Sequence, residues 1–119
     1  MTRHLKTERR EYPRLEQELP LKIAANGYDF TTGTQNISCV GAYCHIDRYI
    51  PPFTKISVKI TLPMMYDNKE EGYAVDCKGV VVRAEDETKG GFNIAIFFNE
   101  ISQRQRQKIS QYISQFLPK

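Results

Sequence analysis

Residues 55–62 read Lys-Ile-Ser-Val-Lys-Ile-Thr-Leu, and this stretch does most to decide the fold. Apolar side chains alternate strictly with polar ones and stand at Ile56, Val58, Ile60 and Leu62. Successive side chains of a β-strand point to opposite faces, so this alternation predicts a strand with one face buried and one face in water.

Five further stretches have strand character and lie at residues 21–25, 28–37, 41–46, 73–84 and 91–98. The first two are separated by Asn26-Gly27, the dipeptide that most strongly favours a tight hairpin turn. We expect a long loop over residues 63–72, which are polar after two methionines, and an acidic turn over residues 85–90.

Near the end of the chain, the apolar residues recur with a different spacing. Ser102 followed by Gln105 is a capping-box pattern, which begins a helix by satisfying free backbone N–H groups. Apolar side chains then recur at helical spacing and form one stripe: Ile109, Tyr112, Ile113, Phe116 and Leu117. Six short strands followed by one helix predict an all-β domain, and a small closed barrel capped by the terminal helix is the architecture we expect.

The composition agrees with one globular domain. The 119 residues are 40% hydrophobic and 26% charged, which excludes a mainly disordered or collagen-like chain. There is no apolar run of about 18 residues, as a membrane span requires, and no apolar segment follows the charged N-terminus, as in a secretory signal. Three cysteines match no disulfide framework, so we expect a reducing, cytoplasmic location.

The formal net charge of +3 is concentrated in residues 1–14. Five basic side chains stand there against two acidic ones, whereas the rest of the chain has twelve of each. A localised cluster suits a small anion better than a long duplex, which would need a basic face across the domain. We expect residues 1–19 to be a flexible or ligand-ordered arm, residues 20–100 the barrel and residues 101–119 the helix.

The residues that often carry catalysis or metals form no recognisable set. Cys39, Cys44 and His45 do not have the spacing of a zinc site. Carboxylates occur in runs that suit solvated loops, and the glycine-rich and nucleophile motifs of common enzymes are missing from the sequence. We therefore expect neither an enzyme nor a metal centre.

An arginine pattern, Arg10-x-x-x-Arg14, follows directly after Arg9. Pro13 makes a helical ladder of ion pairs unsuitable for Arg10 and Arg14. One guanidinium group can donate two parallel hydrogen bonds to the oxygens of a phosphate. It can bind the O6/N7 edge of guanine in the same bidentate way.

A second pattern, Asn36-x-Ser38-x-x-Gly41, stands at the end of an expected strand. Asn36 and Ser38 are two residues apart and would share one face, and Gly41 would allow a ligand close to the backbone. Together the two patterns describe a pocket for an anion that carries guanine, although each alone also suits a solvated run or an ordinary turn.

Both patterns, in this order, resemble the signature of the PilZ domain family. The likeness extends over about residues 8–117, including a Gly-Val-Val-Val-Arg strand at residues 79–83 and the closing helix. It implies a six-stranded antiparallel β-barrel that binds the bacterial second messenger cyclic di-GMP and has no other cofactor.

The resemblance also implies roles for individual residues. Arg10 and Arg14 would hold guanine edges and phosphates, Asn36 and Ser38 would contact base or phosphate, and Gly41 would permit the turn. A long basic residue at the position of Arg9 is associated in the family with an intercalated ligand dimer. Asn36 stands where the family commonly has Asp, which replaces an acceptor with a group that also donates. Ligand binding would order the arm and signal to an unidentified effector protein, in processes such as motility or biofilm formation.

Two other functions stay open at this stage. One is a PilZ-like adaptor that binds a protein and no nucleotide. The other is a small barrel for single-stranded nucleic acid, which the balanced charge of residues 15–119 disfavours. Phe53, Met64, Met65 and Tyr66 are either an exposed patch for a partner or ordinary core and loop anchors.

Overall fold

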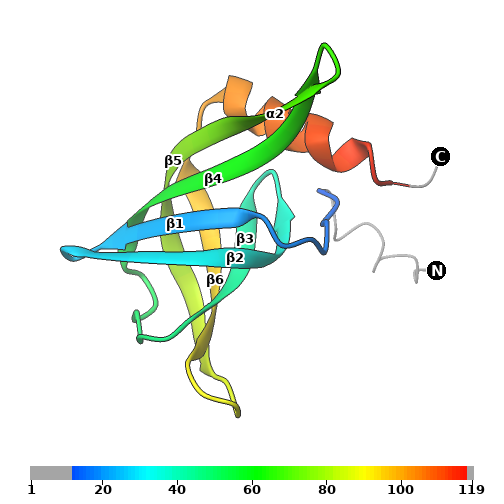
Figure 1. The fold of residues 1–119 in the computed structure, drawn as a ribbon. Helices are drawn as coiled ribbons and strands as arrows, with labels where there is room; N and C mark the ends of the chain where they lie inside the picture. Colours follow the sequence, from blue (N-terminus) through cyan, green and yellow to red (C-terminus); the bar gives the residue numbers. More distant parts are fainter. Residues whose placement is uncertain (1–11, 118–119) are drawn as a thin grey trace, which may run out of the picture.

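The computed structural model of the chain describes residues 12–117 and contains six strands and one helix (Figure 1). Their bounds are β1 Pro20–Ala25, β2 Tyr28–Ser38, β3 Gly41–Ile46, β4 Lys55–Tyr66, β5 Lys69–Asp86, β6 Phe92–Glu100 and α2 Gln103–Ser114. The predicted all-β class with a C-terminal helix is confirmed.

The strands form a closed ring in the order β1-β2-β3-β6-β5-β4, and every neighbouring pair is antiparallel. Pairing of β1 with β4, for example Leu21 opposite Ile60, closes the ring. Ile56, Val58, Ile60 and Leu62 all point into the core and are buried, as the alternation at residues 55–62 predicts. The Asn26-Gly27 turn also forms, with φ angles of 52° and 83° that suit a tight hairpin.

The prediction of a long loop over residues 63–72 is wrong, because β4 and β5 continue through this region as a long hairpin. Their register runs unbroken to Tyr66 opposite Lys69. Only Asp67 and Asn68 form the turn, with φ angles of 51° and 65° that Asp and Asn tolerate better than most residues. The tip of this hairpin reaches past α2 (Figure 1), and its largely exposed residues lack the alternation that marks a half-buried strand.

The helix begins as the capping pattern predicts, since the Ser102 hydroxyl accepts a hydrogen bond from the Gln105 N–H at 3.2 Å. The Gln105 side chain does not complete the box. In the orientation that satisfies both of its groups, its amide bonds the backbone of Asp76 on β5, with distances of 2.6 and 3.2 Å. Ile109, Tyr112 and Ile113 are buried.

One residue of the expected apolar stripe departs from it, since Leu117 is partly buried against the core but Phe116 is not. The helix stops at Ser114, and Phe116 is about half exposed with its ring 5.2 Å from that of Tyr112. Phe116 follows the last helical turn, so its position in the 3.6-residue period no longer points it at the core.

The segment before β1 is bound to the ring, which corrects the expectation of a flexible arm over residues 12–19. Leu15 and Ile37 exchange two backbone hydrogen bonds of 2.8 and 3.0 Å. The buried hydroxyl of Thr34 accepts from the Leu19 N–H at 2.9 Å and donates to the Gln17 carbonyl at 2.6 Å. The rest of the expected arm, residues 1–11, lies outside the described residues.

Candidate functional site

The two sequence patterns meet in the structure through one hydrogen bond. The Arg14 guanidinium donates from Nη1 to Oδ1 of Asn36 at 2.7 Å, across 22 residues of sequence. Backbone pairing at Leu15 fixes the chain one residue after Arg14. Asn36 lies on β2, directly after an irregularity in the β2–β3 register between Thr34 and Asn36.

This contact borders a surface pocket of about 410 Å³ between β3, β5 and β6. Its chemically distinctive lining residues are Arg14, Asn36, Tyr43, Val82, Arg83 and Phe97. Phe97 is 46% exposed and Val82 is similarly open, so an apolar surface lies beside the basic groups. The pocket thus combines guanidinium donors with an aromatic ring that can pack against a planar base.

Comparison with known proteins shows which family the chain belongs to. The sequence matches the model of the PilZ domain family over residues 8–115. The chain belongs to the PilZ domain family. No curated protein sequence matches it closely enough to identify it further.

Solved structures place this PilZ domain among similar folds. It matches Bacillus subtilis inhibitor of motility (MotI/DgrA) at a TM-score of 0.78 and 20% identity, over 97% of this chain and 51% of that one. The chain therefore spans about half the length of MotI/DgrA.

Two other structures are PilZ domains in their own descriptions. The PilZ domain of Escherichia coli YcgR with c-di-GMP has a TM-score of 0.58 and 13% identity, over 88% of each chain. The PilZ domain of CeSA from a cellulose-synthesising bacterium has a TM-score of 0.52 and 17% identity, over 85% of this chain and 93% of that one. At these identities the likeness shows the fold alone.

The candidate ligand residues of this PilZ domain are not all at the pocket. Arg14, Asn36 and Gly41 lie together there. Ser38 is buried, and its hydroxyl accepts a 3.2 Å hydrogen bond from the Val40 N–H, so in this structure it closes the β2–β3 turn. Arg9 and Arg10 lie outside the described residues.

The packing of the six-stranded ring requires a glycine at position 41. A Cβ atom at this position would collide with the carbonyl oxygen of Ile96 on the neighbouring strand β6. The expectation that Gly41 permits a close ligand approach therefore has a second explanation, the close approach of β3 and β6.

Tyr43, Arg83 and Phe97 also line the pocket, and sequence reasoning missed them. Arg83 lies 6.0 Å from the Tyr43 ring centroid and 3.8 Å, Nε to Oε2, from Glu85. One signal was available, because Ile94, Ile96 and Phe98 alternate inward on β6 and leave Phe97 on the outer face.

The cysteines and His45 are used in packing and in a loop contact. Burial raises the pKa of Cys44 to about 12, and burial together with Asp76 raises that of Cys77 to about 11, so both thiols are protonated at neutral pH. The His45 Nε2 lies 2.8 Å from the Gly90 carbonyl oxygen. Residues 12–117 contain no cluster of three or more His, Cys, Asp or Glu side chains placed to hold a metal ion.

Proposed function

We propose that this PilZ domain is a cytoplasmic, non-catalytic receptor for cyclic di-GMP. The observation that carries the proposal is the Arg14–Asn36 hydrogen bond, which joins the two family patterns at the edge of one pocket. The family supports the ligand class, and one similar structure, that of the YcgR domain, is described with c-di-GMP.

The pocket suits a guanine nucleotide chemically. A guanidinium group has five N–H donors, and Arg14 uses one of them on Asn36, which leaves others for phosphate or the O6/N7 edge of guanine. Phe97 and Val82 offer an apolar surface for the base, and Arg83 adds a second positive charge. In this proposal Arg9 and Arg10 complete the site from the N-terminal side, while Ser38 holds the turn that presents Asn36 and Gly41.

Isothermal titration with cyclic di-GMP tests the proposal directly. We expect saturable binding by the wild type and a loss of affinity of about 100-fold for Arg10→Ala and for Arg14→Ala, because each loses charge-assisted hydrogen bonds. Arg104→Ala is the matched control, since Arg104 is an exposed arginine on α2 that does not line the pocket. Two ligands per chain would support the intercalated dimer proposed for Arg9.

A folded wild type that gives no heat would contradict the receptor proposal and favour an adaptor that binds protein without nucleotide. Binding of a single-stranded oligonucleotide that weakens steeply with salt would favour the nucleic-acid reading instead.

Signalling would use the segment before Leu15. We propose that the ligand orders residues 1–14 against the ring and so creates a surface for an effector protein. Residues 15–19 are already paired with β2, so they should respond little.

Amide hydrogen exchange with and without saturating cyclic di-GMP checks this division. We expect new protection within residues 1–14 and unchanged protection at residues 15–19. Unchanged exchange throughout residues 1–14 would contradict the proposed signal even if binding is confirmed.

A further inference from the structure

The turn between β3 and β4 contains a residue that its backbone does not favour. Thr54 N–H bonds the Pro51 carbonyl at 3.3 Å, which makes residues 51–54 a β-turn with Pro52 and Phe53 at its centre. Phe53 has a φ of 73°, as the third residue of a type II turn requires. Glycine or asparagine is the usual residue there, because a bulky side chain is strained at positive φ.

The other non-glycine residues with positive φ follow that rule. Among residues 12–117 they are Asn26, Asp67 and Asn68, all short polar side chains in hairpin turns. Phe53 is the exception, and its side chain is 83% exposed. The phenyl group of Phe53 therefore adds almost no buried apolar surface to the core. The fold offers no reason for phenylalanine at this position.

The turn holds Phe53 firmly in place. The Phe53 N–H donates to the Val81 carbonyl at 2.6 Å, and the Val81 N–H donates to the Thr54 carbonyl at 3.0 Å. The Thr54 hydroxyl bonds Pro51 at 2.7 Å, and Ile50 is buried in the core. An exposed aromatic ring on a fixed backbone loses little entropy when it is bound, which is typical of anchor residues in protein interfaces.

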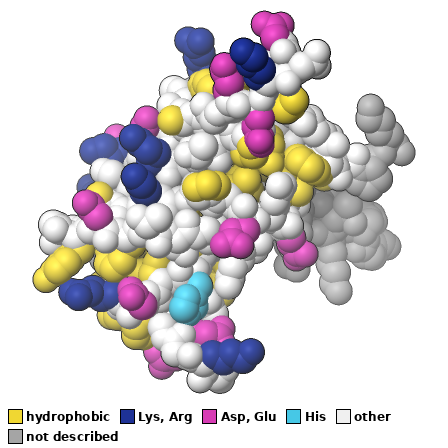
Figure 2. Space-filling model, in the orientation of Figure 1, with side chains coloured by type: hydrophobic (Ala, Val, Ile, Leu, Met, Phe, Trp, Pro, Cys, Tyr) yellow, Lys and Arg dark blue, Asp and Glu magenta, His cyan; other side chains and the backbone are white. Residues whose placement is uncertain are grey.

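Two more exposed aromatic side chains belong to the β3–β4 loop or contact it. Tyr49 is half exposed and packs edge-on against Phe92 at 5.3 Å. Tyr28 is also half exposed, and the Arg48 guanidinium lies 4.6 Å from its ring centroid. Figure 2 shows hydrophobic side chains gathered at the lower left, where Figure 1 places the β1–β2 turn and the β3–β4 loop.

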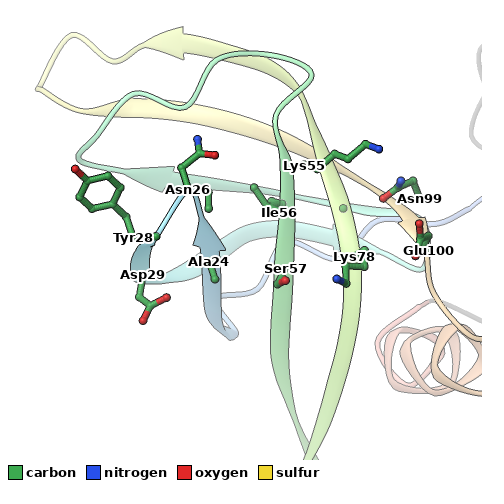
Figure 3. Close-up of a pocket in the computed structure, with 13 residues that line it drawn as sticks. Ala24, Asn26, Tyr28, Asp29, Lys55, Ile56, Ser57, Lys78, Asn99 and Glu100 are labelled. Atoms are coloured by element: carbon green, nitrogen blue, oxygen red, sulfur yellow. The ribbon is translucent and has the colours of Figure 1, made fainter.

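A polar pocket of about 410 Å³, which Tyr28 helps to line, lies between the β1–β2 turn, the start of β4, the middle of β5 and the end of β6 (Figure 3). Tyr28 and Asp29 stand on one side of the pocket, with Lys55, Lys78 and Glu100 on the other. It shares no lining residue with the pocket at Arg14. The two positive and two negative side chains balance.

We propose that Phe53 anchors a protein-protein contact by inserting into an apolar pocket of a folded partner protein. The polar pocket beside it would receive side chains from the partner's rim. Exposed aromatics with an arginine, surrounded by polar groups, have the composition of an interface hot spot. The balanced charge disfavours an anionic lipid surface, which attracts basic patches. This inference does not depend on nucleotide binding.

Site-specific photo-crosslinking in the native cells identifies the partner. A benzophenone amino acid is placed at position 53 and, as the control, at position 65. Met65 is 66% exposed near the opposite end of β4, so it matches Phe53 as an open apolar side chain. We expect an adduct of one defined mass from position 53 only.

The purified partner is then titrated with the wild type, Phe53→Gly and Met65→Ser. We expect Phe53→Gly to weaken binding by about 30-fold or more, and Met65→Ser to change it by less than about threefold. Thermal melting should show Phe53→Gly to be at least as stable as the wild type, because glycine suits the backbone there.

Several results would overturn the proposal. They are a Phe53→Gly protein that unfolds at a lower temperature, no adduct from position 53, the same adduct from both positions, or a partner that binds Phe53→Gly as tightly as the wild type. A self-adduct with concentration-dependent dimerisation would show that a second copy occupies the surface. Flotation with phosphatidylcholine–phosphatidylglycerol vesicles that is lost in Phe53→Gly would show a lipid contact instead.

Discussion

At the scale of single residues, the absence of a side chain at Gly41 matters both for the packing of β3 against β6 and for the pocket at Arg14. Gly41 stands opposite Phe97 in the β3–β6 register, and a Cβ atom there would collide with the Ile96 carbonyl oxygen. Gly41 also lines the pocket at Arg14, together with Phe97. A glycine in the family pattern therefore has a packing role that is separable from any ligand contact.

We expect Gly41→Ala to lower the free energy of unfolding by about 1–3 kcal/mol, because the added methyl group pushes β3 away from β6. Urea unfolding measures this loss. Gly72→Ala is the control: its Cβ would meet only the Thr61 methyl carbon, at 2.9 Å, on the exposed hairpin. That variant should change stability by less than about 1 kcal/mol. Equal stability of Gly41→Ala and the wild type would argue against the packing role.

At the scale of elements, the segment before β1 behaves as an additional piece of the sheet. Thr34 is the residue that holds it, because its buried hydroxyl bonds both the Leu19 N–H and the Gln17 carbonyl. Leu15 pairs with Ile37 farther along β2. The backbone next to Arg14 is thereby set before any ligand arrives, which reduces the ordering cost of binding.

Thr34→Val should release this segment. Valine has nearly the same shape but leaves the Leu19 N–H and the Gln17 carbonyl without their partner, so we expect a loss of about 2–3 kcal/mol in unfolding free energy. Amide exchange should show reduced protection around residues 15–19. Thr61→Val is the control, because the Thr61 hydroxyl bonds no residue within 12–117. Unaltered protection of the segment in Thr34→Val would mean that the backbone bonds alone hold it, namely the Leu15–Ile37 pair and the bond from the Thr34 N–H to the Leu19 carbonyl.

At the scale of the whole molecule, one core is built by all six strands and the helix. It contains side chains as distant in sequence as Leu19 and Ile113, and it encloses Cys39 and Cys44. β5 connects the two proposed surfaces, since Val81 bonds the Phe53 turn while Val82 and Arg83 line the pocket at Arg14. The helix α2, the one helix within residues 12–117, is too short and too polar to cross a membrane.

The buried thiols should make the stability of the whole fold fall at alkaline pH. Unfolded cysteine ionises at a pKa of about 8.5, whereas folding raises the pKa of Cys44 to about 12 and that of Cys77 to about 11. The unfolded state therefore loses protons first. Stability is retained below about pH 8.5 and lost progressively up to pH 11–12, with a slope approaching about 1.4 kcal/mol per pH unit for one such thiol.

Urea unfolding under reducing conditions at several pH values between neutral and alkaline measures this slope. Cys44→Ala lowers the stability at neutral pH by creating a small cavity, but it should flatten the alkaline decline. A decline of the same steepness in Cys44→Ala and the wild type would assign the pH dependence to other groups, among them Tyr112, whose pKa burial also raises.

Local patterns in the sequence determined most of the strands, the helix start and three residues of the candidate site, Arg14, Asn36 and Gly41. Alternation at residues 55–62 predicts a strand because its pleat repeats every two residues, and Asn26-Gly27 predicts a turn because both residues tolerate positive φ. The two short patterns contributed Arg14 and Asn36, which the structure brings together at the pocket. These signals are local, so they can be read without knowing the fold.

Only the tertiary structure decided which distant residues share a surface. Pairing of Leu15 with Ile37 attaches a segment that its charged composition predicts to be free. One pocket is lined from three strands by Tyr43, Arg83 and Phe97. The Ser38 side chain instead accepts a hydrogen bond within the β2–β3 turn. The exposure of Phe53 likewise depends on a turn bonded to β5, 28 residues later in the chain. Such arrangements arise from long-range packing and hydrogen bonding, which leave no periodic mark on the sequence.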